Sequence, residues 1–70
     1  MSTIQSPVSG SVLRLEVQVG DVVSAGQALA VIESMKMEIP VEAESAGTVT
    51  AIHVQPGDHV EEDAAFADIA

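Results

Sequence analysis

The sequence predicts an all-β fold: a flattened β-barrel or sandwich of two four-stranded antiparallel sheets, related by a pseudo-twofold internal repeat. Eleven valines and five isoleucines, 16 β-branched aliphatic residues among 70, occur in short runs with polar neighbours. This pattern is typical of half-buried strands and disfavours helix throughout. Short groups of Gly, Pro, Asp and Ser separate the runs and indicate turns. A repeat of 24 residues at a constant offset of 37 completes the evidence for two equivalent halves.

The expected strands follow one another along the chain with short turns between them. The apolar runs predict strands near 3–5, 11–17, 22–23, 28–32, 37–43, 47–54, 59–60 and 65–69. Within 11–17, strict alternation predicts one apolar face formed by Leu13, Leu15 and Val17.

The internal repeat aligns residues 10–33 with residues 47–70 without a gap, and ten of the 24 positions are identical. The identical pairs are Gly10/Gly47, Val12/Val49, Val17/Val54, Gln18/Gln55, Gly20/Gly57, Asp21/Asp58, Val23/Val60, Ala28/Ala65, Ala30/Ala67 and Ile32/Ile69. Two such halves, neither able to bury its apolar face alone, are expected to pack together. Asp63 stands at the place of Gly26, which predicts that this turn has diverged.

The join between the halves is the hairpin expected at 34–38. The twofold relation places this hairpin at the opposite end of the molecule from both Met1 and Ala70. Whatever the hairpin carries is therefore expected to project freely, away from the chain ends.

Length, charge and cysteine content restrict the class of protein. Seventy residues predict a single domain over 1–70, with little room for the cleft of a complete enzyme. The absence of cysteine from the sequence excludes a disulfide-rich or zinc-thiolate fold. Eleven acidic residues against two basic ones give a net charge of -9, which disfavours nucleic acid and anionic membranes and favours basic protein partners. Neither a signal peptide nor a membrane-spanning run is apparent, so the expected location is the cytoplasm.

The hairpin contains the one candidate for chemistry, Lys36, which is the only lysine of the chain. An exposed hairpin turn ordinarily selects Asn, Asp or Gly. Here Met35 and Met37 flank the lysine instead, and they offer flexible apolar surface that suits varied partners. The alternative is that both methionines pack against the barrel and Lys36 is an ordinary solvated turn residue.

The residues 33–40, Glu-Ser-Met-Lys-Met-Glu-Ile-Pro, resemble the biotin-attachment hairpin of biotinyl domains, and the resemblance covers nearly the whole chain. Members of that family commonly show Ala-Met-Lys-Met, and here Ser34 takes the alanine place. The stretch from Gly10 to Gly20 is too short for the protruding thumb loop of some family members. The chain therefore resembles the thumbless biotin carboxyl carriers.

The resemblance implies that Lys36 is the covalent attachment site for biotin and that the protein is a non-catalytic carrier. It also implies three partners: a biotin protein ligase that attaches the cofactor, a biotin carboxylase that loads the carboxyl group, and a carboxyltransferase that unloads it. The reactivity belongs to the cofactor, and the protein supplies a rigid mount. Ligase recognition is expected to use the neighbours of Lys36, which are Glu33, Ser34, Met35, Met37 and Glu38.

Three other functions remain as alternatives. A lipoyl carrier would also be modified on Lys36, although lipoyl domains usually carry Asp-Lys-Ala at this hairpin. An unmodified interaction module would use the acidic surface, and the run 61–63 is expected to be either a solvated loop or a docking site for a basic partner. An autonomous enzyme fits least, since the sequence shows no phosphate-binding loop and no nucleophile with an identifiable base. His53 and His59 predict no metal site, because no cysteine accompanies them and their spacing does not match common zinc motifs.

Overall fold

The computed structural model describes residues 2–70, and within this range the chain forms eight β-strands and no helix. The strands are β1 (Ser2–Gln5), β2 (Gly10–Leu15), β3 (Val22–Val23), β4 (Ala28–Ser34), β5 (Met37–Glu42), β6 (Gly47–Ile52), β7 (His59–Val60) and β8 (Ala65–Ile69). Each strand boundary lies within two residues of its expected place, and the all-β prediction is confirmed. Over the same residues, no helix long and apolar enough to cross a membrane is found.

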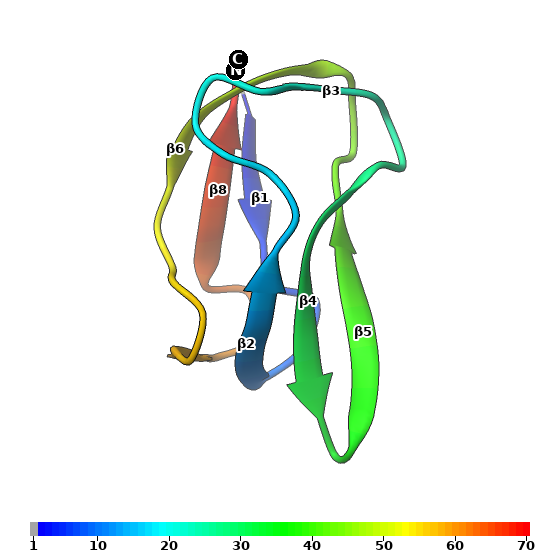
Figure 1. The fold of residues 1–70 in the computed structure, drawn as a ribbon, viewed down its shortest axis with the longest axis vertical. Coiled ribbons are helices and arrows are strands. Elements are labelled where there is room, and N and C mark those ends of the chain that lie inside the picture. Colours follow the sequence, from blue (N-terminus) through cyan, green and yellow to red (C-terminus); the bar gives the residue numbers. More distant parts are fainter. Residues whose placement is uncertain (1) are drawn as a thin grey trace.

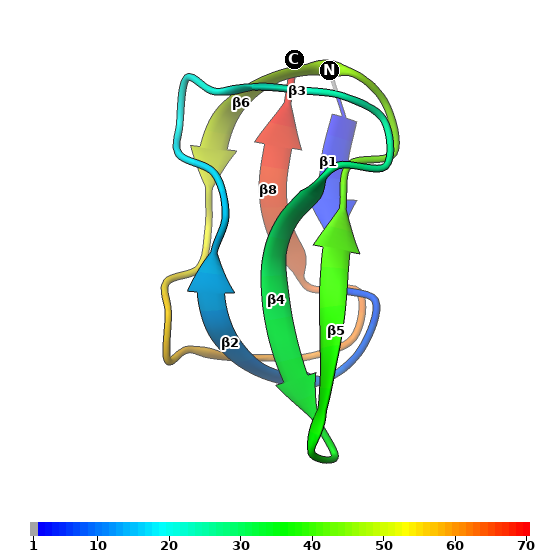
Figure 2. The ribbon, with the colours of Figure 1, turned by 45° about the vertical axis from the view of Figure 1, so that its right-hand side comes forward.

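Two four-stranded antiparallel sheets pack face to face, in the orders β1-β8-β6-β3 and β5-β4-β2-β7. Figures 1 and 2 show the two sheets enclosing the centre of an elongated body, whose extents are 30 × 18 × 18 Å. Among the described strands, the chain changes sheet at every connection except the hairpin between β4 and β5. This hairpin therefore leaves the body as a continuous two-stranded ribbon.

The hydrogen bonds of the two halves repeat with the same offset of 37 residues. The Gly20 amide donates to the Val49 carbonyl at 2.8 Å, and the Gly57 amide donates to the Val12 carbonyl at 2.7 Å. Strand β1 occupies the place of β5, β2 that of β6, β3 that of β7, and β4 that of β8. The structural repeat is longer than the sequence repeat, because β1 and β5 are equivalent without sharing an identical residue.

With this extension, residues 2–33 match residues 39–70, and the segment 34–38 joins the two matched halves.

Close contact between neighbouring strands within each half explains two glycines. A Cβ on Gly10 would lie 2.5 Å from the carbonyl oxygen of Glu33 and 2.7 Å from a methyl group of Ile32. A Cβ on Gly47 would meet the equivalent atoms of Ala70 and Ile69. Only a residue without a side chain fits at these two positions.

Strand β2 does not alternate as its sequence predicts. A β-bulge between Val12 and Arg14 leaves Leu13 without a partner residue in β4. As a result Leu13 is 38% exposed, whereas Val12 is 2% exposed and faces the core. The prediction that Leu13 shares an inward face with Leu15 and Val17 was therefore wrong for Leu13, because the bulge shifts the alternation by one residue.

The prediction that the turn at Asp63 has diverged was also wrong. Asp63 has φ of 70° and Gly26 has φ of 84°, so both residues occupy the left-handed region. The Asp63 amide donates to the Ser6 carbonyl at 2.8 Å, as the Gly26 amide donates to the Ala43 carbonyl at 2.8 Å. Aspartate enters the left-handed region more readily than most residues, so the turn keeps its shape.

The core lies between the sheets and draws equivalent side chains from both halves. Leu29 and Phe66, which occupy matching bulges of β4 and β8, are each 1% exposed. Ile32 and Ile69 are buried in the same way at 0% and 2%. The core between the sheets is thus packed with aliphatic side chains and a single aromatic ring.

The two ends of the described chain lie together at the end of the molecule opposite the β4–β5 hairpin (Figure 1). Ser2 pairs with Ile69 across β1 and β8, which fixes this proximity. Met1 lies outside the described residues, so the expected position of the N-terminus is tested from Ser2 onward. From that residue, the arrangement is the one that the repeat predicts.

Candidate functional site

The hairpin closes with a two-residue turn formed by Met35 and Lys36. Ser34 pairs with Met37 directly below the turn. The φ angles of Met35 and Lys36 are 53° and 66°, so both residues are in the left-handed region, as a type I′ turn requires. Each side chain there costs about 1–2 kcal/mol relative to an ordinary conformation. Local conformational preference therefore does not explain why Met and Lys occupy this turn.

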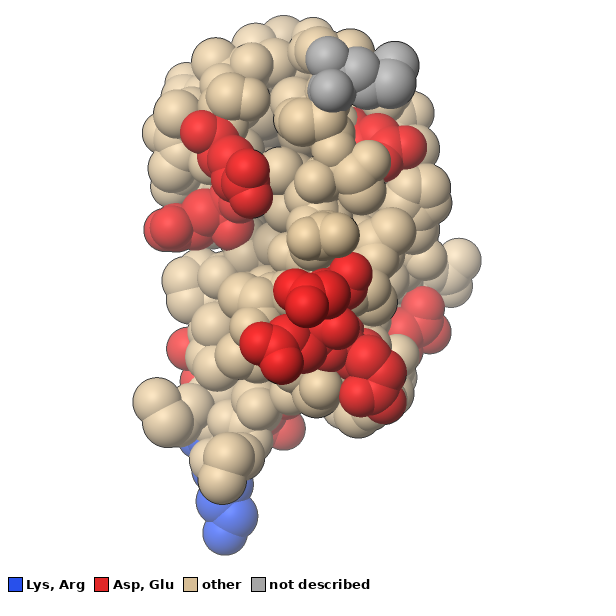
Figure 3. All heavy atoms as spheres, turned by 180° about the vertical axis from the view of Figure 1, so that it is seen from behind, with Lys and Arg blue, Asp and Glu red and all other residues tan. Residues whose placement is uncertain are grey.

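The turn and its flanks project into solvent. Met35 is 92% exposed and Met37 is 64% exposed, and Lys36 is exposed as well. The alternative in which the methionines pack against the barrel is therefore wrong. Among residues 2–70, Lys36 takes part in no ion pair. Figure 3 shows basic atoms extending beyond the body at the hairpin end, while acidic side chains cover several areas of the visible face.

Two carboxylates face each other at the base of the turn, since Glu33 pairs with Glu38 across β4 and β5. Like charges placed directly opposite in a sheet destabilise it by roughly 0.2–1 kcal/mol. Arg14 on β2 offsets part of this repulsion: its Nη1 lies 3.9 Å from Glu38 Oε1, and its Nε donates to Glu16 Oε1 at 2.6 Å. These groups are exposed, so each pair contributes at most about 1 kcal/mol.

All five expected recognition residues lie on this one hairpin. Glu33, Met35, Met37 and Glu38 are exposed, and Ser34 is half-buried where β4 ends. The structure thus brings them together around Lys36.

The sequence analysis did not identify two features of this site. The first is the left-handed conformation at both central turn residues, Met35 and Lys36. The expected strands at 28–32 and 37–43 leave four residues between them, so they gave no signal of a two-residue turn. The second is the contact from Arg14, which reaches the hairpin from β2 across β4. Its only sequence signal is that Arg14 is the other basic residue of the chain.

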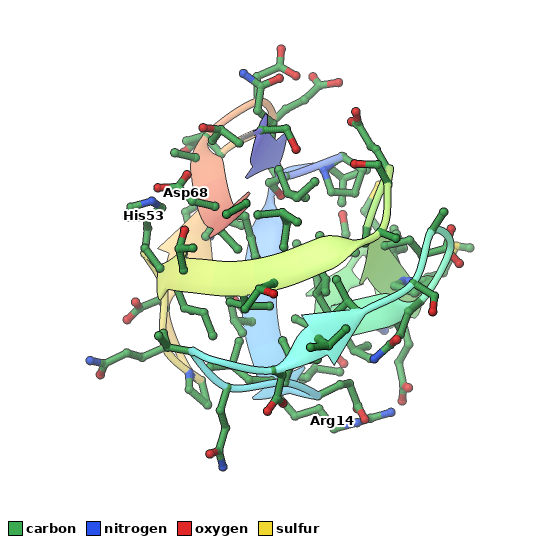
Figure 4. The ribbon with its side chains drawn as sticks, turned by 90° about the horizontal axis from the view of Figure 1, so that it is seen from above. Arg14, His53 and Asp68 are labelled. Carbon is green, nitrogen blue, oxygen red and sulfur yellow. The ribbon has the colours of Figure 1, made fainter. Side chains whose placement is uncertain are left out.

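The two histidines lie in separate acid–base pairs. His53 Nε2 is 3.2 Å from Asp68 Oδ2, and the Thr3 hydroxyl donates to the other oxygen of Asp68 at 3.0 Å. Figure 4 shows His53 and Asp68 side by side, far around the molecule from Arg14. His59 Nε2 is 3.3 Å from Glu61 Oε1. Across residues 2–70, no group of three or more His, Cys, Asp or Glu residues is placed to hold a metal ion.

The acidic run 61–63 is an exposed turn fixed to the β1–β2 connection. The Ser9 hydroxyl donates to Glu61 Oε2 at 3.1 Å and accepts from the Glu62 amide at 3.0 Å. Both expected roles, a solvated loop and a docking site for a basic partner, need this exposure. Docking at this loop stays a prediction.

The profile of the family described as "Biotin-requiring enzyme" matches residues 2–69. The chain is 48% identical over 59 residues to a biotin carboxyl carrier protein of Streptococcus mutans, covering 84% of this chain and 45% of that protein. It is 38% identical over 60 residues to a biotin/lipoyl attachment protein of Bacillus subtilis, covering 86% and 82%. It is 44% identical over 61 residues to the human mitochondrial propionyl-CoA carboxylase alpha chain, covering 87% and 8%.

Solved structures of carboxylases also contain segments similar to this chain. The urea carboxylase of Kluyveromyces lactis contains a segment that superimposes with a TM-score of 0.94 and 35% identity, covering 99% of this chain and 6% of that one. A single-chain long-chain acyl-CoA carboxylase superimposes with a TM-score of 0.88 and 26% identity, covering 94% and 7%. The chain therefore spans less than half of the streptococcal relative and a small part of these carboxylases.

Proposed function

Because the chain belongs to the family of biotin-requiring enzymes, as a biotin/lipoyl attachment domain, we propose that it is a biotin carboxyl carrier modified on Lys36. One observation carries the proposal: the only lysine of the chain stands in an exposed left-handed turn. That turn lies in the segment that joins the two repeat halves.

The hairpin fits covalent attachment of the cofactor. The Lys36 amine is exposed and forms no ion pair with residues 2–70, so its approach to an incoming acyl group is open. An amide at Nζ removes the positive charge and leaves the turn itself unchanged. When attached, biotin supplies the ureido nitrogen that takes up and releases a carboxyl group. The chain holds this group on a rigid two-stranded mount, and tethering raises its concentration at each partner's active site.

The partners form part of the proposal. A biotin protein ligase forms the amide, and its recognition surface is the set Glu33, Ser34, Met35, Met37 and Glu38. A biotin carboxylase loads the carrier and a carboxyltransferase unloads it. The names of the relatives, which include carrier proteins and carboxylases, support a non-catalytic role within such a system. The final acceptor is chosen by the carboxyltransferase, so this chain does not determine it.

Two further statements remain predictions within the proposal: that 1–70 act as a single carrier domain, and that the protein works in the cytoplasm. Folding and biotinylation of the isolated 70-residue chain would test the first. Cell fractionation followed by detection of biotinylated protein would test the second. Recovery of the protein from a membrane or organelle fraction would contradict the cytoplasmic location.

Lipoylation of Lys36 is a second candidate, because the Bacillus relative is named for both cofactors. The methionines on either side of Lys36 favour biotin, since lipoyl domains usually carry Asp-Lys-Ala at this hairpin. An unmodified interaction module is the third candidate. Intact mass distinguishes all three outcomes, because the two acyl groups differ in mass and the module gains none.

The experiment is co-expression of the chain with a biotin protein ligase, followed by intact mass and an avidin gel-shift. We expect one biotinyl group on the wild-type chain and none on Lys36→Gln. Two relocation variants sharpen the result: Met35→Lys with Lys36→Met, and Met37→Lys with Lys36→Met. Each keeps one exposed lysine but moves it by one place, and each should be biotinylated far more slowly. Equal labelling of both relocation variants would show that the ligase reads any exposed amine, and biotin on Lys36→Gln would place the site elsewhere.

A further inference from the structure

The sulfur atoms of the described chain gather at one place. The sequence has three methionines and no cysteine. Met1 lies outside the described residues, and the other two methionines are the immediate neighbours of Lys36. Soft, oxidisable sulfur is thus confined, within residues 2–70, to the two positions beside the candidate attachment site.

Both side chains are open to small oxidants. Met35, in the left-handed turn, is 92% exposed, and Met37 is 64% exposed. Neither belongs to the buried core cluster or packs against it. The single aromatic residue, Phe66, is 1% exposed. Among residues 2–70, a peroxide in solution therefore meets its most reactive targets at the hairpin.

We propose that Met35 and Met37 are a reversible oxidation site and that their conversion to sulfoxides switches off biotin attachment to Lys36. This inference rests on the proposed function. The oxidant is a hydroperoxide: a thioether lone pair attacks the terminal peroxide oxygen, the O–O bond breaks and an S–O bond forms. Sulfur loses two electrons, and the departing oxygen takes up a proton and leaves as water or an alcohol. A thiol-dependent methionine sulfoxide reductase reverses the change.

The physical effect is confined to recognition. A sulfoxide is polar and adds a strong hydrogen-bond acceptor where the turn had presented apolar surface. A partner that buries these side chains would then bury an unpaired polar group, which is unfavourable. The fold is unaffected, because neither methionine contributes to the core. Oxidation thus alters the surface around the amine without touching the amine or the barrel.

The test treats the reduced 70-residue chain with hydrogen peroxide and maps the added oxygen atoms by peptide mass. Ligase-catalysed biotin incorporation is then measured before oxidation, after it, and after treatment with sulfoxide reductases and a thiol. We expect oxygen on Met35 and Met37, an unchanged melting temperature, and incorporation slowed by at least about tenfold, which corresponds to about 1.4 kcal/mol. Reductase treatment should restore the original rate.

The control is the double variant Met35→Leu with Met37→Leu, which keeps apolar side chains of similar volume and cannot form sulfoxides. Its incorporation rate should not change with peroxide. If leucine itself prevents recognition, the single variants Met35→Leu and Met37→Leu report one sulfur each. Unchanged incorporation by the doubly oxidised wild-type chain would overturn the inference, and so would slowing of the double leucine variant by peroxide to the same extent as wild type. If the reduced wild-type chain accepts no biotin, the proposed function fails, and the switch of biotin attachment fails with it; the oxygen map then reports only whether Met35 and Met37 are the oxidation site.

Discussion

Two kinds of left-handed turn occur in this molecule, and they are built from different residues. At Gly20 and Gly57 the φ angles are 99° and 94°, and glycine adopts them without steric cost. Each turn is fixed by an aspartate: Asp21 accepts from the Gln18 amide at 2.9 Å, and the equivalent Asp58 bond is also 2.9 Å. These turns use residues that suit the backbone.

The hairpin turn is the opposite case. Met35 and Lys36 adopt positive φ with side chains that disfavour it, and the carboxylates of Glu33 and Glu38 face each other just below. Both the turn residues and the facing carboxylates lower the free energy of unfolding. The difference teaches that residues in the body suit the backbone conformation they adopt, whereas residues at the tip do not, which supports the proposal that the tip residues serve recognition by a partner. Variants in the two regions should therefore separate stability from function.

The largest effect on stability is expected in the core that supports both halves. Val12→Ala and Val49→Ala remove methyl groups at equivalent positions that are 2% and 1% exposed. Each should lower the free energy of unfolding by roughly 1–3 kcal/mol, because the energy lost with the buried methyl groups and the cost of the cavity left behind add together. Chemical denaturation measures the change. Very different values for the two variants would show that the halves are not energetically equivalent.

A smaller loss is expected at the glycine turns. Gly20→Ala and Gly57→Ala meet no atom within 4 Å of the new Cβ, so the cost is purely conformational. We expect a loss of about 1–2 kcal/mol for each, from the left-handed φ alone. Thermal or urea unfolding compares them with wild type. Ligase-catalysed biotin incorporation at a temperature where the variants stay folded should be unchanged, and a selective loss of incorporation would break the division between the two regions.

Substitution at the tip should act in the opposite direction. Met35→Asn places a residue that favours the left-handed region in a solvent-exposed turn. The free energy of unfolding should rise by up to about 1 kcal/mol, while biotin incorporation falls because apolar surface is lost. Denaturation curves and incorporation rates on the same sample check both changes. Lower stability in Met35→Asn would show that methionine contributes contacts beyond those described.

The smallest stability change is expected at Lys36, the proposed attachment residue. Lys36→Gln alters an exposed side chain without an ion pair among the described residues. Its free energy of unfolding should stay within about 0.5 kcal/mol of wild type, while avidin binding disappears. A melting curve resembling that of Val12→Ala would instead make Lys36 a structural residue.

The sequence predicts the fold well because alternation, turn residues and the repeat all report on the same two-sheet packing. It fails at Leu13, since a bulge is set by the neighbouring strand rather than by local pattern. It fails at Asp63 because the turn keeps its geometry with a different residue. The extension of the repeat to β1 and β5 leaves no identical residues, so backbone pairing alone reveals it.

The residues of the candidate site could be predicted from the sequence, but the backbone conformation of its turn and the contact from Arg14 could not. Lys36 and its two methionines stand out because they do not fit an ordinary hairpin turn. The φ angles of the turn depend on the pairing of Ser34 with Met37, which no single-residue preference encodes. The reach of Arg14 to Glu38 depends on the strand order of the sheet, in which β2 and β5 are separated by β4.

Both ends of the described chain lie opposite the hairpin, so the molecule can rotate about a connection made there and carry the hairpin with it. Its longest dimension is 30 Å, and a connection made at either end lies near one extreme of the long axis while the β4–β5 hairpin, which contains Lys36, lies near the other. Rotation about such a pivot moves the amine along an arc whose radius is close to the full length of the barrel. A short flexible connection would therefore let a group attached at Lys36 move between active sites separated by more than the molecule's own length.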